Sequence, residues 1–259
     1  MDDRRFEGII NLYGEAGFTK LVKAHVLVLG IGGVGSWICE ALVRSGISNL
    51  TIVDLDDICV SNINRQIHST DLTVGKFKVD IMSERLLSIN PKLNITTKQT
   101  FFNEKSSAEI LSTPYDFVID AIDNVQDKVN IIYWCFKNNC PVITVGAAGG
   151  KQDPSKIIVN DLNRTEQDKL LFKVRRHLRR NHHEFRRLHD RTYKIPSVYS
   201  TEKARSLHEI NADNKENTPD ITTKNCNSGY YGSSSIVTAT MGFMTAAHVL
   251  KEITASDLL

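Results

Sequence analysis

The chain has 259 residues, of which 41% are hydrophobic and 24% are charged, with a formal net charge of +2. These values are typical of a globular chain and exclude a low-complexity or fibrous one, and so small a net charge does not by itself indicate a nucleic-acid or membrane partner. Because no linker rich in Pro, Gly and Ser divides the sequence, we expect residues 1–259 to form one domain.

Helix-type and strand-type patterns alternate along the chain as far as residue 160. Continuous apolar or β-branched runs predict strands, and apolar residues spaced three and four apart predict helices. In chain order we expect helical residues at 3–21, a strand at 26–29, a helix at 36–45, a strand at 50–53, a helix at 74–90, a strand at 93–99, a helix at 103–111, a strand at 115–119, a helix at 126–137, and strands at 141–145 and 156–159. This alternation predicts an α/β fold, a Rossmann-like, doubly wound, mostly parallel sheet with helices on both faces.

The first strand leads into GIGGVG at 30–35, which fits the pattern G-x-G-x-x-G, and the second strand ends in Asp54. A strand, a glycine turn, a helix, a second strand and an acid in this order are typical of nucleotide binding. The glycines let the backbone approach a phosphate, and the acid can bind a ribose hydroxyl. The alternative is a tight turn between strand and helix that binds no ligand.

After residue 160 the alternation breaks. Residues 165–191 are rich in arginine and histidine, and residues 200–223 are polar, so we expect 161–225 to be a basic, partly mobile surface insertion. The apolar stretch at 236–250 is interrupted by threonines and a histidine, which favours a buried helix over stable membrane insertion, although it leaves peripheral membrane association open. The arginines that could contact RNA phosphates are Arg175, Arg176, Arg179, Arg180, Arg186 and Arg187. The alternative is a solvated helix face.

Three further features favour cleavage of ATP over binding of an intact dinucleotide. Arg65, in the sequence NINRQ, is a forked cation suited to phosphate oxygens, and a helix beginning near Lys78 can bring an ammonium group to the same phosphates. Asp123 follows a strand and can hold magnesium. Expulsion of pyrophosphate requires positive charge on the leaving group, which such a set supplies.

The motifs GIGGVGS, SNINRQ, VGKFK and DAIDN resemble the nucleotide-binding core of the ubiquitin-activating superfamily, which includes the adenylating enzymes of thiamine and molybdopterin synthesis. Longer segments, from RFEGIINLYGEAG to SGYYGSSSIVTATMGFMTAAHVLKE, are similar to the members that dehydrate threonylcarbamoyladenosine in tRNA. The similarity covers most of the chain apart from 163–192 and 203–224. It implies that ATP activates the threonyl carboxylate as an acyl-adenylate, which the neighbouring carbamoyl group then attacks, releasing AMP.

The resemblance also implies roles for individual residues. Arg65, Lys78 and Asp123 would act in catalysis, with Asp123 holding magnesium, and Arg5 is the nearest match to an arginine that crosses a dimer interface in relatives. A homodimer, an effect of potassium or sodium, and a sulfur-relay protein partner are further expectations. The residues that would bind the nucleotide are Gly30, Gly32, Gly33, Gly35, Asp54, Asp56, Asn62, Arg65, Gln66, Lys78, Asp123 and Asn124.

The sequence has five cysteines and no C-x-x-C pair, so we expect no zinc site. The odd number favours a reducing compartment, the cytoplasm. Four cysteines adjoin apolar segments and are expected to pack in the core, whereas Cys226 lies in a polar setting and has either a loop role or a catalytic one. Two alternative functions remain: adenylation of the C-terminus of a sulfur-carrier or ubiquitin-like protein, and a non-catalytic nucleotide sensor that binds RNA.

Overall fold

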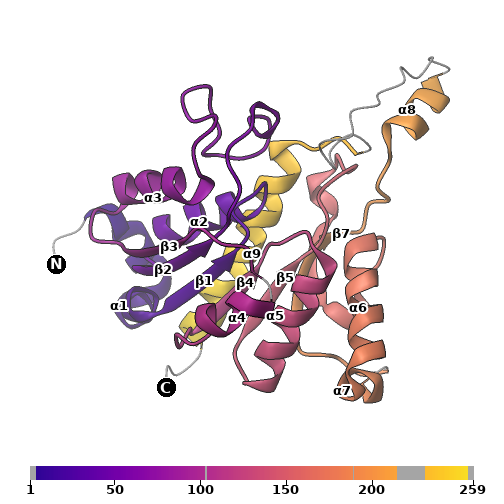
Figure 1. Ribbon diagram of the computed structural model, residues 1–259. Helices are drawn as coiled ribbons and strands as arrows, with labels where there is room; N and C mark the ends of the chain where they lie inside the picture. The colour runs from indigo at the N-terminus through magenta and orange to yellow at the C-terminus, as the bar shows by residue number, and fades with distance from the viewer. Residues whose placement is uncertain (1–3, 103, 189, 215–230, 256–259) are drawn as a thin grey trace.

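The computed structural model describes residues 4–102, 104–188, 190–214 and 231–255. A sheet of seven strands forms its centre (Figure 1). The strands are β1 (His25–Leu29), β2 (Asn49–Val53), β3 (Asn94–Lys98), β4 (Phe117–Asp120), β5 (Val142–Val145), β6 (Ile157–Asp161) and β7 (Pro196–Ser200). Their order across the sheet is β3-β2-β1-β4-β5-β7-β6, and every neighbouring pair is parallel except β6 and β7. The predicted doubly wound, mostly parallel sheet is therefore confirmed.

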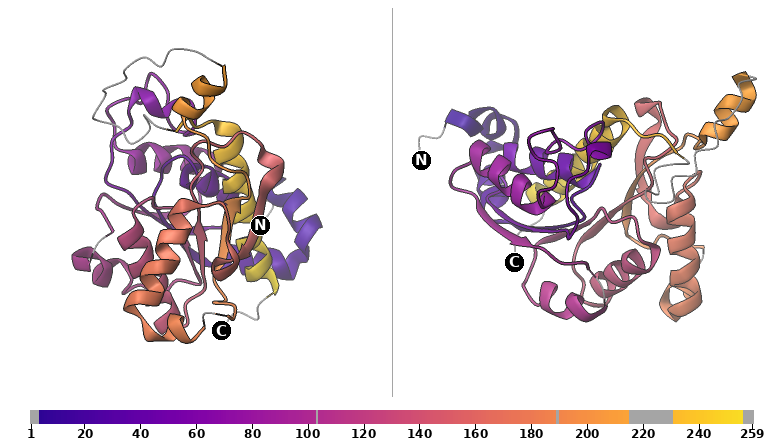
Figure 2. Two further views of the ribbon diagram at one scale, coloured as in Figure 1. Left: turned by 90° about the vertical axis from the view of Figure 1, so that its right-hand side faces the viewer. Right: turned by 45° about the horizontal axis from the view of Figure 1, so that its top comes forward.

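Helices cover both faces of this sheet (Figures 1 and 2). One face carries α1 (Glu7–Lys23), α2 (Gly35–Arg44), α3 (Lys78–Ile89) and α9 (Ser235–Ala255). The other carries α4 (Glu104–Ile110), α5 (Val125–Lys137), α6 (Lys169–Asn181) and α7 (His183–Arg187). Helix α8 (Leu207–Asn214) stands away from the sheet, and short 3-10 turns occur at η1 (Arg4–Phe6), η2 (Val60–Asn62), η3 (Pro154–Lys156) and η4 (Leu162–Arg164).

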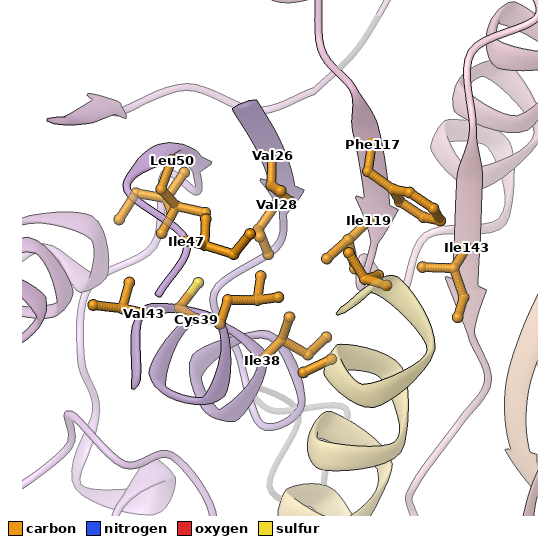
Figure 3. Close-up of a cluster of buried hydrophobic side chains, with 14 of the residues drawn as sticks. Val26, Val28, Ile38, Cys39, Val43, Ile47, Leu50, Phe117, Ile119 and Ile143 are labelled. Carbon is orange, nitrogen blue, oxygen red and sulfur yellow. The ribbon is translucent and has the colours of Figure 1, made fainter. Parts of the chain in front are cut away.

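Strand β1 explains why both faces need helices. Val26 and Val28 belong to the core beneath α2, whereas Leu27 and Leu29 belong to the core on the opposite face, and all four side chains are buried. Figure 3 shows the two valines in the cluster that also contains Ile38 of α2. A parallel strand that is buried on both faces needs a continuous apolar run rather than alternation, which is the pattern of this segment.

The later part of the chain differs from the expected insertion. Residues 196–200 form β7, which pairs with β5 on one side and β6 on the other, so the span 161–225 contains an interior strand of the sheet. The sequence PSVYS is short, and its serines suggest a loop, yet Ser197 and Ser200 are both fully buried. Helix α8 occupies 207–214 of the predicted polar loop, and residues 215–223 lie outside the described ranges.

Helix α9 confirms the expected buried helix, since Val237, Met241 and Val249 are buried against the sheet and α2. Within the described ranges, no helix combines the length and apolarity that a bilayer span requires.

The expectation for the cysteines was wrong at one position: Cys59 is exposed at the start of η2, whereas Cys39 and Cys135 are buried and Cys140 is half-buried. Cys226 lies outside the described residues.

Candidate nucleotide-binding site

The glycine loop joins β1 to α2 at the carboxyl edge of the sheet. Gly30 adopts φ 87°, and a Cβ at Gly35 would lie 1.8 Å from the carbonyl oxygen of Gly30, so the tight turn itself requires both glycines. Gly32 is different, because the nearest atom to a Cβ placed there would be Nε2 of Gln66, at 3.9 Å. The protein leaves the space above Gly32 open, as the close approach of a phosphate requires.

Asp54 links this loop to the end of β2. Its carboxylate accepts the N–H of Ile31 at 2.7 Å and the N–H of Asp56 at 2.9 Å. Burial raises the pKa of Asp54, although the nearby charge of Lys78 opposes the shift. Each carboxylate oxygen has a second lone pair, so Asp54 can still accept from a ribose hydroxyl while it orients the glycine loop.

Lys78 begins α3 with a buried side chain whose ammonium pairs with Asp56 at 2.7 Å. The backbone supports the pair, since the N–H of Lys78 donates to the carbonyl of Asp56 and an isolated antiparallel bridge joins Asp57 to Phe77. Asp56 therefore contacts Lys78. The ammonium lies close enough to Asp54 to influence its pKa, which places it in the same site.

Arg65 lies beside the glycine loop. Its side-chain Cδ would be 3.5 Å from a Cβ at Gly33, and its carbonyl accepts from Trp37 Nε1 at 3.0 Å and from Thr238 Oγ1 at 3.2 Å. The guanidinium donates to the carbonyl of Ser61 at 2.6 Å, so it is held at the loop while much of its fork stays available.

Asn62 and Gln66 come from the same segment as Arg65, and both are buried. The side-chain oxygen of Asn62 accepts the N–H of Cys59 at 3.0 Å and closes the η2 turn. Gln66 faces Gly32, so its amide borders the open space above the loop. Asn62 thus holds the η2 turn in shape, and the amide of Gln66 lines the open space above Gly32.

The end of β4 supplies Asp123, whose side chain is exposed at the same edge. Asn124, predicted to lie at the nucleotide, is also the N-cap of α5, because its oxygen accepts the N–H groups of Gln126 and Asp127. Burial, with the charges of Asp120 and Asp123 as smaller contributions, raises the pKa of Asp127. The described residues include no group of three or more His, Cys, Asp or Glu that could hold a metal.

Sequence reasoning missed a buried triad beneath this edge. Asp120 pairs with Lys128 Nζ at 2.9 Å and accepts from Thr144 Oγ1 at 2.7 Å, and all three side chains are buried. The contacts join β4, α5 and β5 directly below the loop that carries Asp123. An acid at a strand end followed eight residues later by a lysine on the next helix is the only signal, and it is a weak one.

A second missed cluster surrounds the loop at 146–150 after β5. Asp168 caps α6 by accepting the N–H of Leu171 at 2.9 Å, and its other oxygen accepts the N–H of Ala147 at 2.8 Å. Lys151 lies 3.6 Å from the same oxygen and donates to the carbonyl of Ser200. An Asp before an apolar run indicates an N-cap, but the second contact depends on the tertiary fold.

His68 was also missed. Its side chain is only 2% exposed, and neither ring nitrogen has a hydrogen-bond partner. Burial, together with the charges of Lys78 and Arg85, lowers the pKa of His68 to about 4, so the ring is neutral at physiological pH.

The arginines after residue 170 separate into two groups. Arg175 donates to the carbonyls of Leu162 and Thr165, and Arg179 donates to Tyr193 and Asn163, so both brace the η4 turn. Of the other arginines predicted to bind RNA, Arg186 donates to two carbonyls at the end of α6. Its side chain is exposed, as are those of Arg176, Arg180 and Arg187.

A family model, curated relatives and solved structures all point to the same family. The model of the ThiF family matches residues 6–258. A curated relative from Haemophilus influenzae, tRNA threonylcarbamoyladenosine dehydratase, is 42% identical over 97% of this chain and 94% of its own length. The crystal structure of the Escherichia coli tRNA N6-threonylcarbamoyladenosine dehydratase, TcdA, in complex with ATP has a TM-score of 0.85 at 37% identity, over 97% of this chain and 94% of that one. The same E. coli protein in complex with AMP has a TM-score of 0.84 at 38% identity, with the same coverage.

Proposed function

The chain belongs to the ThiF family, and we propose that it uses ATP to dehydrate threonylcarbamoyladenosine in tRNA. The observation that carries this proposal is a match over nearly the whole chain to relatives with that name, 42% identical over 251 residues for the H. influenzae protein. Both chains are similar in length, and one relative binds ATP and AMP in crystals, the substrate and the leaving group of an adenylation.

The chemistry needs activation because a carboxylate is a poor electrophile. The threonyl carboxylate oxygen attacks the α-phosphorus of ATP, the bond to the bridging oxygen breaks, and pyrophosphate leaves. The carbamoyl group of the same side chain then attacks the acyl carbonyl, loses a proton and expels AMP, which closes a ring. The sum is the loss of one water, whose oxygen leaves on AMP. No thiol is needed, because the internal carbamoyl group is the nucleophile.

The residues around the glycine loop suit the first step. Open space above Gly32 supports a phosphate there, and Lys78 and Arg65 supply positive charge at the point where charge develops on pyrophosphate. Lys78 would exchange its present contact with Asp56 for phosphate oxygens. Asp54 would hold the ribose, with its carboxylate already oriented by two backbone N–H groups.

Asp123 would hold magnesium. Magnesium usually binds one or two carboxylates and completes its shell with substrate phosphates and water, and an exposed carboxylate at the carboxyl edge fits that mode. The ion would draw charge from the phosphates, while Asp123 fixes its place. Dependence on potassium or sodium is part of the proposal, without an assigned site.

The tRNA would reach this edge along the basic side of the molecule, where Arg176, Arg180 and Arg187 are exposed. A homodimer is supported by the outer side of α9, where Ile236 and Phe243 are 62% and 48% exposed although apolar. Arg5 would then approach the partner's nucleotide. A sulfur-relay partner and a cytoplasmic location complete the proposal.

The decisive experiment measures AMP release by the purified protein. We expect AMP with tRNA that carries threonylcarbamoyladenosine, none with the same tRNA lacking it, and a modified nucleoside lighter by one water in mass spectrometry. If neither RNA supports AMP release, the dehydratase proposal fails, and the tails of sulfur-carrier or ubiquitin-like proteins become the next substrates to test. A nucleotide sensor would bind RNA without releasing AMP in any of these assays.

A further inference from the structure

Helix α6 carries a straight row of cations on its outer side. Lys169, Lys173, Arg176 and Arg180 are all exposed, and at 3.6 residues per turn they fall within an arc of about 60°. The buried residues Leu171, Val174 and Leu178 occupy the opposite side. Arg175 and Arg179, which donate to protein acceptors, lie between the two.

The direction of α6 connects this row to the nucleotide site. The helix begins at the carboxyl edge, since its cap Asp168 contacts Ala147 directly after β5. It ends at the opposite edge, beside α7 (Figure 1). There the ring of His182 stacks on Tyr133 in the C-terminal half of α5. With a rise of 1.5 Å per residue, the row spans about 16 Å from the first cation to the last.

The first cation also contacts the neighbourhood of the site. Lys169 Nζ lies 3.1 Å from the hydroxyl of Tyr231, and Tyr231 covers the loop after β5, where a Cβ at Gly150 would lie 2.7 Å from its ring. One end of the row is therefore at the edge that carries the glycine loop and Asp123, and the other end is remote from it.

We propose that this row binds the phosphates of one strand of the anticodon stem, so that the loop of the tRNA lies at the carboxyl edge and the stem runs along α6 toward α7. The inference rests on the proposed function. The cations recur every three or four residues, a rise of about 4.5 to 6 Å that is comparable to the spacing of phosphates along one RNA strand. Lys and Arg contacts of this kind position a nucleic acid without reading its sequence. The row adds Lys169 and Lys173 to the arginines already considered as contacts to RNA phosphates.

The test reverses two charges of the row, with Lys173→Glu and Arg180→Glu in one protein. The control protein carries Lys23→Glu and Lys92→Glu, which make the same change in net charge at exposed positions on other elements. The substrates are tRNA carrying threonylcarbamoyladenosine and a short single-stranded oligonucleotide with the same nucleoside and no stem. Hydroxyl-radical footprinting of the tRNA provides a readout independent of activity.

We expect the row variant to raise the KM for tRNA by on the order of tenfold or more and to lower the slope of log affinity against log salt by about 2, with kcat, the KM for ATP and the KM for the oligonucleotide unchanged. The footprint on one strand of the anticodon stem should disappear, and the control should match the wild type. An unchanged KM for tRNA, or an equal loss with both substrates, would overturn the inference. If the wild type releases no AMP with modified tRNA, the proposed function fails instead, and the footprint still decides whether the row binds the stem.

Discussion

The carboxylate of Asp168 caps helix α6 with one oxygen and accepts the N–H of Ala147 at 2.8 Å with the other. A single side chain thus joins the N-terminus of the basic helix to the loop after β5. Lys151, also buried, lies 3.6 Å from the shared oxygen. The geometry of the helix and that of the loop therefore depend on one buried charge pair.

We predict that Asp168→Ala lowers the free energy of unfolding by on the order of 3–5 kcal/mol, because it leaves the Lys151 ammonium buried without its partner as well as removing the cap. Urea denaturation measures the loss. Asp153→Ala is the matched control: it removes the cap of η3, where the ion-pair partner Lys156 is exposed, and should lower the free energy of unfolding far less. If both variants lost the same free energy of unfolding, the stabilising role of the buried Asp168–Lys151 pair would be contradicted.

Two glycine substitutions should separate ligand binding from folding. Gly32→Ala should leave the melting temperature nearly unchanged, because its Cβ meets nothing closer than 3.9 Å, but should weaken ATP binding by at least about tenfold, since a methyl group enters the space for phosphate. Gly35→Ala should unfold at a clearly lower temperature, because its Cβ would lie 1.8 Å from a carbonyl oxygen. Calorimetry of ATP binding and thermal unfolding of both variants check the pair; normal ATP affinity in Gly32→Ala would place the phosphates elsewhere.

Arg65→Lys keeps a positive charge beside the glycine loop but loses the guanidinium fork. We expect kcat for AMP formation to fall by about 10²–10³, as for the loss of one preorganised donor in a transition state, with little change in affinity for tRNA. Unchanged kcat in Arg65→Lys would show that charge alone is needed at this position.

Asp123→Asn should lower kcat for AMP formation by a similar factor, and a higher magnesium concentration should partly restore the kcat.

His68 should make the stability of the fold sensitive to acid. Its pKa in the folded protein, about 4, is below the ordinary value of 6.5, so the folded state resists protonation. The group imposes no cost above pH 6.5, and stability should decrease as the pH falls from about 6.5 to about 4, by about 3 kcal/mol in total. His68→Phe cannot titrate and should lose less stability over that range in urea denaturation. Parallel pH profiles for the two proteins would contradict the prediction.

Much of the candidate nucleotide site could be predicted from sequence because its signals are local. The pattern at 30–35 specifies a turn that only glycine allows at Gly35, and Asp54 follows the next strand at a spacing that the fold requires. The sequence also suggested one role for each side chain, whereas several have two. Asn124 caps a helix and Asp56 holds Lys78, and neither contact is visible from residue type alone.

The sequence by itself determined the alternating α/β architecture, the glycine loop and the acids at strand ends, since these depend on periodicity and turn chemistry within a few residues of each other. The tertiary structure decided that residues 196–200 form an interior strand of the sheet, that Asp168 contacts Ala147, and that only some arginines of α6 face outward. The physical reason is that each of these depends on partners far away in the chain. A short segment with two serines becomes a strand only when strands on both sides satisfy its backbone, and an arginine becomes structural only when distant carbonyls accept from it.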